Sequence, residues 1–225
     1  MIKVSNVFKN YSKKIVLKNI NLEIKKGEKI AIMGLNGSGK TTLAEIILKI
    51  FSPSSGEVVY EDKNISKNAT FQDINFDGEL NLKQLVNFYC GAFKVKVNTS
   101  EYFKKFDLEN ETKQKYLKLS GGQKQKFKFL ITLLNNPKLL LLDELTTSLD
   151  YLWRHKIVLL IKDYIIKNDC TLIMVSHDIE EVSQLCDRVL LMSNGEIIKD
   201  LDLKKTKEES INILKKEILS NASNI

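Results

Sequence analysis

The sequence lacks any apolar run long enough to cross a membrane. The longest candidates, Leu139–Leu142 and Ile157–Ile161, are short and end in charge. A membrane-spanning helix needs about 18 or more such residues in a row. The N-terminus, MIKVSNVFKNY, also lacks the apolar core of a signal peptide. If this protein works at a membrane, we therefore expect it to dock onto another chain.

Cysteine is scarce as well. Cys90, Cys170 and Cys186 stand far apart among apolar residues, and no CxxC pair or Cys/His cluster occurs. A zinc site is built from such clusters, so the sequence argues against one. Reduced, partly buried thiols are typical of cytoplasmic proteins.

Arginine is almost absent, although the net charge is +7. Arg154 and Arg188 are the only arginines, and the remaining basic charge is lysine scattered along the chain. Bidentate recognition of bases and phosphates favours arginine, and no dense basic block or aromatic-rich basic patch is present. We therefore expect no nucleic-acid partner.

The residues that are present are typical of one α/β domain. The 225 residues are 43% hydrophobic and 28% charged, as in ordinary globular proteins. Alternating apolar residues predict strands at Ile2–Val7 and Val16–Ile24, with a loop at Lys9–Lys14 between them. Residues 74–136 look helical throughout. After Pro137, apolar strands alternate with helices, which predicts a parallel sheet covered on both faces.

A glycine-rich loop follows the apolar strand Lys29–Met33 and precedes a helix predicted at Thr41–Ile50. Residues 34–41 read GLNGSGKT, which matches the phosphate-binding pattern G-x-x-x-x-G-K-[ST]. Glycines let backbone N–H groups approach phosphate oxygens, Lys40 supplies a positive charge, and the Thr41 hydroxyl can bind Mg²⁺. The predicted phosphate-binding residues are Gly34, Asn36, Gly37, Ser38, Gly39, Lys40, Thr41 and Thr42.

Two adjacent carboxylates end a later apolar strand, in the sequence LLLLDE at 139–144. An ATPase that uses a phosphate-binding loop needs an acidic residue at the tip of a neighbouring strand to hold Mg²⁺, and Asp143 fits that position. Glu144, one residue further on, points elsewhere and is predicted to polarise the attacking water.

Residues 119–123 read LSGGQ, between the glycine-rich loop and LLLLDE. With these motifs in this order, the sequence resembles the nucleotide-binding subunits of ATP-binding-cassette (ABC) transporters. The resemblance implies an α/β fold, with a P-loop NTPase core, a mostly parallel sheet, an N-terminal antiparallel β edge and an inserted helical subdomain. We expect a single domain: the core at 1–73 and 137–200, the helical subdomain at 74–136 and a helical tail at 201–225.

The resemblance also implies a second phosphate-binding segment. In the family, the signature loop binds the γ-phosphate of ATP held by the opposite subunit. Independently of the family, this loop precedes a helical pattern at Gln123–Leu134, and helix N-termini attract anions. A head-to-tail dimer would use both phosphate-binding ends of each chain. The predicted residues are Ser120, Gly121, Gly122 and Gln123.

Further site residues are implied by the resemblance. Tyr11 stands where the family stacks an aromatic ring on adenine. Gln72 stands where a glutamine touches Mg²⁺ and senses the membrane partner. Ser148-Leu149-Asp150 resembles the loop that crosses the dimer interface, and His177 resembles the switch histidine near the γ-phosphate. Two positions depart from the family pattern: Leu145 replaces a proline, and Lys126 replaces an arginine.

The expected function is ATP hydrolysis coupled to closure of two subunits. A homodimer, or a pair with a related ATPase subunit, would enclose two ATP molecules with Mg²⁺. Closure would drive a separate multi-span permease at the cytoplasmic face of the cell membrane. The residues around Glu180-Glu181 and Gly195-Glu196 look most like those of exporters, so export is the expected direction.

Other functions remain open at this point. The main alternative is a soluble ABC ATPase in repair, iron–sulfur assembly or translation. Another is a regulatory subunit that binds ATP without hydrolysing it, against which Glu144 and His177 argue. A GTPase would need an Asn-Lys-x-Asp guanine motif, which is absent from the sequence.

Overall fold

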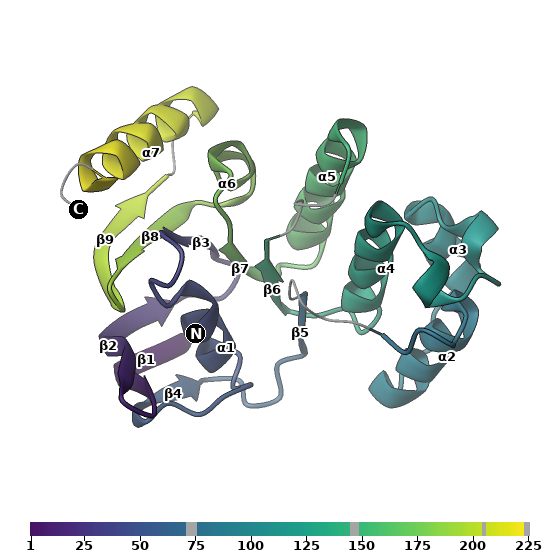
Figure 1. Cartoon of the computed structure of the whole chain (residues 1–225), viewed down its shortest axis with the longest axis horizontal. Coiled ribbons are helices and arrows are strands. Elements are labelled where there is room, and N and C mark those ends of the chain that lie inside the picture. The colour runs from purple at the N-terminus through teal and green to yellow at the C-terminus, as the bar shows by residue number, and fades with distance from the viewer. Residues whose placement is uncertain (71–75, 145–148, 204–205, 223–225) are drawn as a thin grey trace.

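A computed structural model describes residues 1–70, 76–144, 149–203 and 206–222. For residues 219–222 it describes the backbone alone. Across this described part, no helix combines the length and the apolar character needed to cross a membrane. Two sheets and a set of helices make up the fold (Figure 1).

The first sheet is antiparallel and contains β1 (Ile2–Tyr11), β2 (Lys14–Ile24) and β4 (Ser55–Tyr60) in the order β2-β1-β4. The loop predicted at Lys9–Lys14 is wrong. Lys9 pairs with Leu17 and Tyr11 with Lys14, so the hairpin continues almost to its turn. Polar residues are tolerated there because one face of this sheet is exposed, as antiparallel sheets allow.

The second sheet contains six strands. Its order is β5-β6-β7-β3-β8-β9, and all neighbours are parallel except β8 and β9, which form a hairpin. The strands are β3 (Lys29–Gly34), β5 (Lys67–Thr70), β6 (Leu139–Asp143), β7 (Thr171–Val175), β8 (Arg188–Ser193) and β9 (Glu196–Asp202).

The central strands of this sheet are buried on both faces, which is why their sequences are continuously apolar. Along β3, Ile30 and Ile32 face α1 (Lys40–Ile47) and the antiparallel sheet. Ala31 and Met33 face the helices on the other side. This alternation follows from the two-residue period of a strand. Helix α1 ends earlier than predicted, and Lys49 beyond it has a positive φ of 59°.

Between residues 76 and 138, the described chain is helical, with one isolated bridge joining Asn81 and Lys115. Short 3-10 turns at Glu109–Glu111 and Tyr116–Lys118 connect these helices. Figure 1 shows α2, α3 and α4 together at one end of the molecule. The helices there are α2 (Leu82–Phe93), α3 (Thr99–Lys105) and α4 (Gly121–Leu133).

Three further helices lie on the core. Helices α5 (Tyr151–Lys167) and α6 (Ile179–Leu185) follow β6 and β7 in the chain. The last helix, α7 (Lys207–Ala222), is capped as predicted: the Glu209 carboxylate accepts hydrogen bonds from the backbone N–H and the hydroxyl of Thr206, each at 3.0 Å. Leu214 is fully buried, which anchors the tail to the core.

Candidate functional site

The glycine-rich loop joins the carboxyl end of β3 to the N-terminus of α1. Gly39 immediately precedes the helix and has a φ of 101°, in the left-handed region that favours glycine. A Cβ atom at Gly34 would lie 2.2 Å from the carbonyl oxygen of Met192, so only glycine fits beside β8. The loop therefore keeps its backbone N–H groups close to whatever binds at the start of α1.

Lys40 lies at the centre of this loop. Its ammonium group donates hydrogen bonds of 2.9 Å to the carbonyl oxygens of Gly34 and Leu35, and the residue is only 6% exposed. Burial lowers the pKa of Lys40, while the nearby carboxylates of Glu144 and Asp143 act in the opposite direction. A partly desolvated cation held by neutral carbonyls is ready to exchange them for a charged ligand.

The turn of the β8–β9 hairpin braces the glycine-rich loop. The backbone N–H of Gly195 donates to the carbonyl oxygen of Ser38 at 3.1 Å, and the Gly195 carbonyl accepts from Lys18 at 2.8 Å. Beneath this contact, the buried hydroxyl of Ser38 has no hydrogen-bond partner within the described part of the chain. An unsatisfied buried hydroxyl in a loop of this kind is a group that a bound ligand or water could satisfy.

A cavity of about 480 Å³ opens over the start of α1. It brings together most of the predicted phosphate-binding residues with Glu144 from the neighbouring strand. Lys14, Val16 and Val175 also line it, and the sequence analysis did not include them. The lining residues are Lys14, Val16, Asn36, Gly37, Gly39, Lys40, Thr41, Thr42, Glu144 and Val175.

The two predicted acids lie at the tip of β6, beside β7. Asp143 is 5% exposed and pairs with Val175, the last residue of β7. The backbone N–H of Glu144 donates to the Val175 carbonyl at 3.0 Å, and Glu144 has a positive φ of 49°. The Glu144 side chain lines the cavity.

His177 follows β7 and lies next to Glu144. The Nε2 atom of His177 is 3.4 Å from Oε1 of Glu144, and the His177 side chain is about half exposed at 48%. The adjacent Ser176 and Asp178 are held in place: the Asp178 backbone donates to the Ser176 hydroxyl, and the Asp178 carboxylate caps α6. Parallel strands end at the same edge of a sheet, so Asp143, Glu144 and His177 lie at that edge.

Two predicted residues lie outside this group. Tyr11 is 47% exposed at the end of β1, with the Lys9 ammonium 5.0 Å from its ring centre. It is absent from the cavity lining, although Lys14, its partner in the hairpin, is part of that lining. Gln72 lies outside the described residues, as does Ser148 of the predicted interface loop.

The LSGGQ segment forms the N-terminus of α4. The Ser120 hydroxyl accepts a hydrogen bond from the Gln123 backbone N–H at 3.2 Å, and the Ser120 backbone N–H donates to the side-chain oxygen of Gln123 at 2.9 Å. Ser120 and Gly121 are exposed, and a Cβ atom at Gly121 would meet nothing within 4 Å. This helix end is therefore ordered and open, and in Figure 1 α4 and α1 lie in different parts of the molecule.

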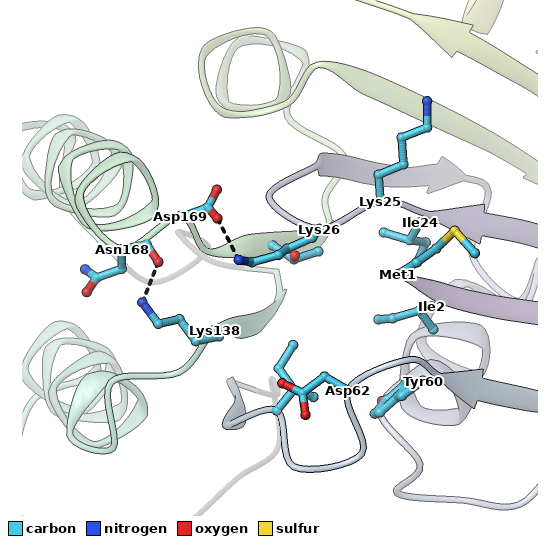
Figure 2. A pocket seen from close by; sticks show the side chains of 12 residues that line it. Met1, Ile2, Ile24, Lys25, Lys26, Tyr60, Asp62, Lys138, Asn168 and Asp169 are labelled. Carbon is cyan, nitrogen blue, oxygen red and sulfur yellow. Dashed lines mark hydrogen bonds and ion pairs between the residues drawn. The ribbon is translucent and has the colours of Figure 1, made fainter.

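A second cavity, of about 230 Å³, lies at the opposite edge of the sheet, where the parallel strands begin (Figure 2). Lysines line it, but Lys26 pairs with Asp169 at 3.2 Å and Lys138 donates to the Asn168 carbonyl at 2.7 Å. Ile2 and Ile24 line the same cavity. It contains no glycine-rich loop or helix N-terminus, so the first cavity is the better match to phosphate chemistry.

Comparisons with known proteins agree on one family. Residues 17–147 match the sequence pattern of the family described as ABC transporter. The spermidine/putrescine import ATP-binding protein PotA of Mycoplasma mycoides is 36% identical over 210 residues, which cover 88% of this chain and 60% of that protein. The methionine import ATP-binding protein MetN of Helicobacter acinonychis is 32% identical, with 88% and 66% covered.

Solved structures give the same answer. A bacterial ABC transporter cassette solved as a dimer has a TM-score of 0.81 and 30% identity, covering 91% of this chain and 100% of that one. CbiO1 from Clostridium perfringens, part of the ABC transporter complex cbiONQ, has a TM-score of 0.75 and 32% identity, with 95% and 93% covered.

These relatives also bear on length and direction. The chain spans about 60% of the length of PotA, which is longer. PotA, MetN and the nickel protein NikE of Staphylococcus aureus are all named as import proteins, so they do not support the expected export direction. The fold, the order of the motifs and these similarities agree: the chain belongs to the ABC transporter family.

Proposed function

We propose that this chain hydrolyses ATP and powers a separate membrane-spanning permease. One observation carries the proposal: the buried ammonium of Lys40 lies in the same cavity as Glu144, at the edge where Asp143 ends β6 and His177 follows β7. Positive charge for phosphate, a carboxylate for a metal and a carboxylate for water are the parts that phosphoryl transfer requires.

Phosphate binding is assigned to the glycine-rich loop and Lys40. An ammonium group has three donors, and two of those of Lys40 are engaged by the carbonyls of Gly34 and Leu35. Phosphate oxygens arriving at the start of α1 would meet backbone N–H groups and this charge together. The remaining loop residues, Asn36, Gly37, Ser38, Gly39, Thr41 and Thr42, shape the cradle.

Mg²⁺ fits the donors at this edge when it arrives with the nucleotide. Among the described residues, no cluster of three or more His, Cys, Asp or Glu could hold a metal without other ligands. The buried carboxylate of Asp143 and the hydroxyl of Thr41 are hard oxygen donors, which suits an ion that keeps waters and phosphate oxygens in its shell. We assign Thr41 and Asp143 as ligands, with Gln72 as a third.

Glu144 is assigned as the general base. Its carboxylate enters the cavity beside His177, whose Nε2 lies 3.4 Å away and can orient it. The base would take a proton from water as the water attacks the γ-phosphorus and the bond to the bridging oxygen breaks, releasing ADP. Lys40 would balance the charge on the phosphate oxygens, and Mg²⁺, when bound, would supply further positive charge. We assign His177, beside Glu144, to contact the γ-phosphate.

The active form is proposed to be a dimer with two shared ATP sites. Each chain has an open helix end at Ser120, Gly121, Gly122 and Gln123, in a different part of the fold from its own glycine-rich loop. A second copy arranged head to tail would bring its Ser120 to the phosphate held by the first copy's Lys40. The similar cassette solved as a dimer supports this arrangement. In the proposed dimer, residues 74–136 of this chain would form the helical subdomain, residues 1–73 and 137–200 the core, and residues 201–225 a tail.

The relatives support a permease partner and the import direction. CbiO1 is part of a transporter complex, and PotA, MetN and NikE are named for import. We propose import, with this chain held at the cytoplasmic face of the membrane by its partner. These names do not favour a soluble ABC ATPase of repair or translation.

Glu144→Gln tests the proposal. It removes the base but leaves Lys40 and Asp143 intact, so ATP binding should survive while hydrolysis falls by roughly 10²–10⁴-fold. ATP should then remain trapped, and size-exclusion chromatography should show a dimer with Mg-ATP and a monomer without it. Asp143→Asn is the matched control, because it should lose Mg²⁺-dependent activity without forming the stable dimer. A Glu144→Gln protein that hydrolyses ATP normally would refute the assignment.

A further inference from the structure

The only tryptophan of the chain, Trp153, carries two lysine ammonium groups on its ring. The Nζ atom of Lys126 lies 3.9 Å from the ring centre, and that of Lys156 lies 4.6 Å from it. Both distances are well within the range in which a cation is attracted to an aromatic face, and tryptophan is the strongest such acceptor.

The ring belongs to the start of α5, directly after the predicted interface loop. The Asp150 carboxylate accepts a hydrogen bond from the Trp153 backbone at 2.9 Å and so caps the helix. Trp153 itself is 7% exposed and packs in the main hydrophobic core. Its position is therefore fixed relative to the sheet, and so is any group that rests on it.

Both cations connect this ring to the helical segment. Lys126 lies on α4, six residues after Ser120, and Figure 1 shows α4 next to α5. Lys156 lies on α5, and its ammonium binds both carboxylate oxygens of Asp107, beyond the end of α3, at 2.7 and 2.8 Å. The segment 76–138 is thus held to the core at two places. Lys126 of α4 rests on the Trp153 ring, and Asp107 binds Lys156, whose ammonium rests on the same ring.

The environment of the Lys126 ammonium favours its contact with the Trp153 ring. Burial lowers the pKa of Lys126, and Lys156 acts in the same direction, while Asp107, Asp150 and Glu111 oppose both. A partly desolvated ammonium gains more from an aromatic face than an exposed one does.

We propose that Trp153 is a positioning residue, which holds α4 at a fixed angle to α5 through Lys126 and so aligns Ser120 with the ATP of the opposite subunit. The inference rests on the proposed dimer. Because α5 begins at the interface loop, the same ring links the two segments of one chain that would face the partner. Removing the contact between Lys126 and the Trp153 ring should weaken closure of the dimer. The rate of ATP hydrolysis in an assembled dimer should not change.

The test compares Lys126→Gln and Trp153→Leu with Lys126→Arg. In the Glu144→Gln background with saturating Mg-ATP, we expect the first two to raise the protein concentration for half-maximal dimerisation by about three- to thirtyfold, the factor that a partly buried cation–π contact corresponds to. Lys126→Arg should restore the midpoint, since a guanidinium also binds an aromatic face. With Glu144 intact, kcat at saturating protein should stay within about twofold of wild type, since no reacting group is changed.

The fluorescence of Trp153 offers a second measurement of its contact with Lys126. As the single tryptophan, it is the dominant source of indole fluorescence. Lys126→Gln should alter its emission in the free chain. Lys162→Gln, the same charge change at an exposed position of α5, should leave emission and dimerisation unchanged.

The outcomes separate this inference from the proposed function. If Glu144→Gln alone does not dimerise with ATP, the dimer proposal fails first. If it dimerises and Lys126→Gln has no larger effect than Lys162→Gln, the positioning role is refuted. If Trp153→Leu does not fold, Trp153→Phe keeps the packing with a weaker aromatic face and should give an intermediate midpoint. If Trp153→Phe and Lys126→Gln, each tested alone, both dimerise at the same protein concentration as the Glu144→Gln parent, the proposal is also overturned.

Discussion

Lys40 keeps an ammonium group in a position where burial opposes its charge. Because burial lowers the pKa of Lys40, the protein gains little stability from this charge, and we expect its benefit to appear when phosphate binds. Lys40→Met keeps the length of the side chain without the charge. We expect the Tm of the free protein to stay the same or to rise, and the increase in Tm on adding ATP to vanish. For comparison, a ligand at a hundredfold excess over its Kd stabilises the wild type by about 2.7 kcal/mol. Differential scanning fluorimetry measures both, and a full ATP-dependent increase in the variant would contradict the role of Lys40.

Tyr11 is the residue expected to stack on the adenine ring of ATP. Its ring is 47% exposed beside the cavity-lining hairpin residue Lys14. If it stacks on adenine, Tyr11→Ala should weaken ATP binding by about 1–3 kcal/mol, as for other base-stacking residues. Tyr11→Phe should bind almost normally, since it keeps the aromatic face. Calorimetric titration with ATP and GTP would show a similar loss for both, and an unchanged affinity for Tyr11→Ala would remove this residue from the site.

Site residues differed in how far the sequence could identify them. The glycine-rich loop, Asp143 and Glu144 could be predicted as candidates because phosphate and metal chemistry demand fixed residue types at fixed spacings. Val16 and Val175 could not, because an apolar residue in a strand gives no sign that it will border a cavity. They reach the site only because the β1–β2 hairpin and β7 converge on the start of α1.

At the scale of an element, the turn between β8 and β9 is predicted to support the nucleotide loop. Gly195 has a φ of 83°, and a Cβ atom there would lie 2.5 Å from the Val16 carbonyl oxygen. Gly195→Ala should lower the free energy of unfolding by more than about 1 kcal/mol, since the alanine is strained as well as crowded. It should also weaken ATP binding, because the Gly195–Ser38 hydrogen bond is disturbed. Chemical denaturation and ATP titration measure the two effects.

Gly91→Ala is the control for this substitution. Gly91 lies in α2, with nothing within 4 Å of an added Cβ atom. Alanine there should stabilise the protein by about 0.5–1 kcal/mol through helix propensity, and ATP binding should not change. Should Gly195→Ala behave in the same way, the hairpin would have no part in shaping the site.

Strands could be predicted from the sequence where burial requires apolar residues. A strand that is held mainly by hydrogen bonds could not be predicted in this way. Strands β3, β6, β7 and β8 are apolar because both their faces are covered. Strand β5, with the sequence KNAT, was missed. It is held by pairing with β6 and by the side chain of Asn68, which donates to the Thr132 carbonyl at 2.9 Å. Such a strand lacks the apolar pattern on which sequence reasoning depends.

For the whole molecule, the proposed dimer predicts complementation between two inactive chains. Ser120→Arg places a bulky group at the partner's phosphate, and Lys40→Ala removes the phosphate contact of its own chain, so each homodimer should be inactive. A mixed dimer keeps one intact site, made from Lys40 of the first chain and Ser120 of the second. An equal mixture should recover up to about a quarter of wild-type activity if the two sites act independently in a two-fold dimer.

The mixing experiment needs each variant to be folded. Circular dichroism and the ATP-dependent Tm of the Ser120→Arg chain, which retains its own Lys40, provide that check. Folded chains that show no activity after mixing would argue against shared sites. Normal hydrolysis by Ser120→Arg alone would argue against them more directly.

The position of β3 at the centre of the parallel sheet has a consequence for how the chain is made. Ile30 pairs with Ile173 on one side and with Arg188 on the other, so both neighbours of β3 are synthesised about 140 residues or more after it. At a synthesis rate of roughly 5–20 residues per second, the nascent strand waits about 7 to 30 seconds for them. During that interval its isoleucines and the nucleotide loop have no sheet to join. We expect early domain folding on the ribosome to be limited to the β1–β2–β4 sheet, and nucleotide to bind only after β8 has emerged.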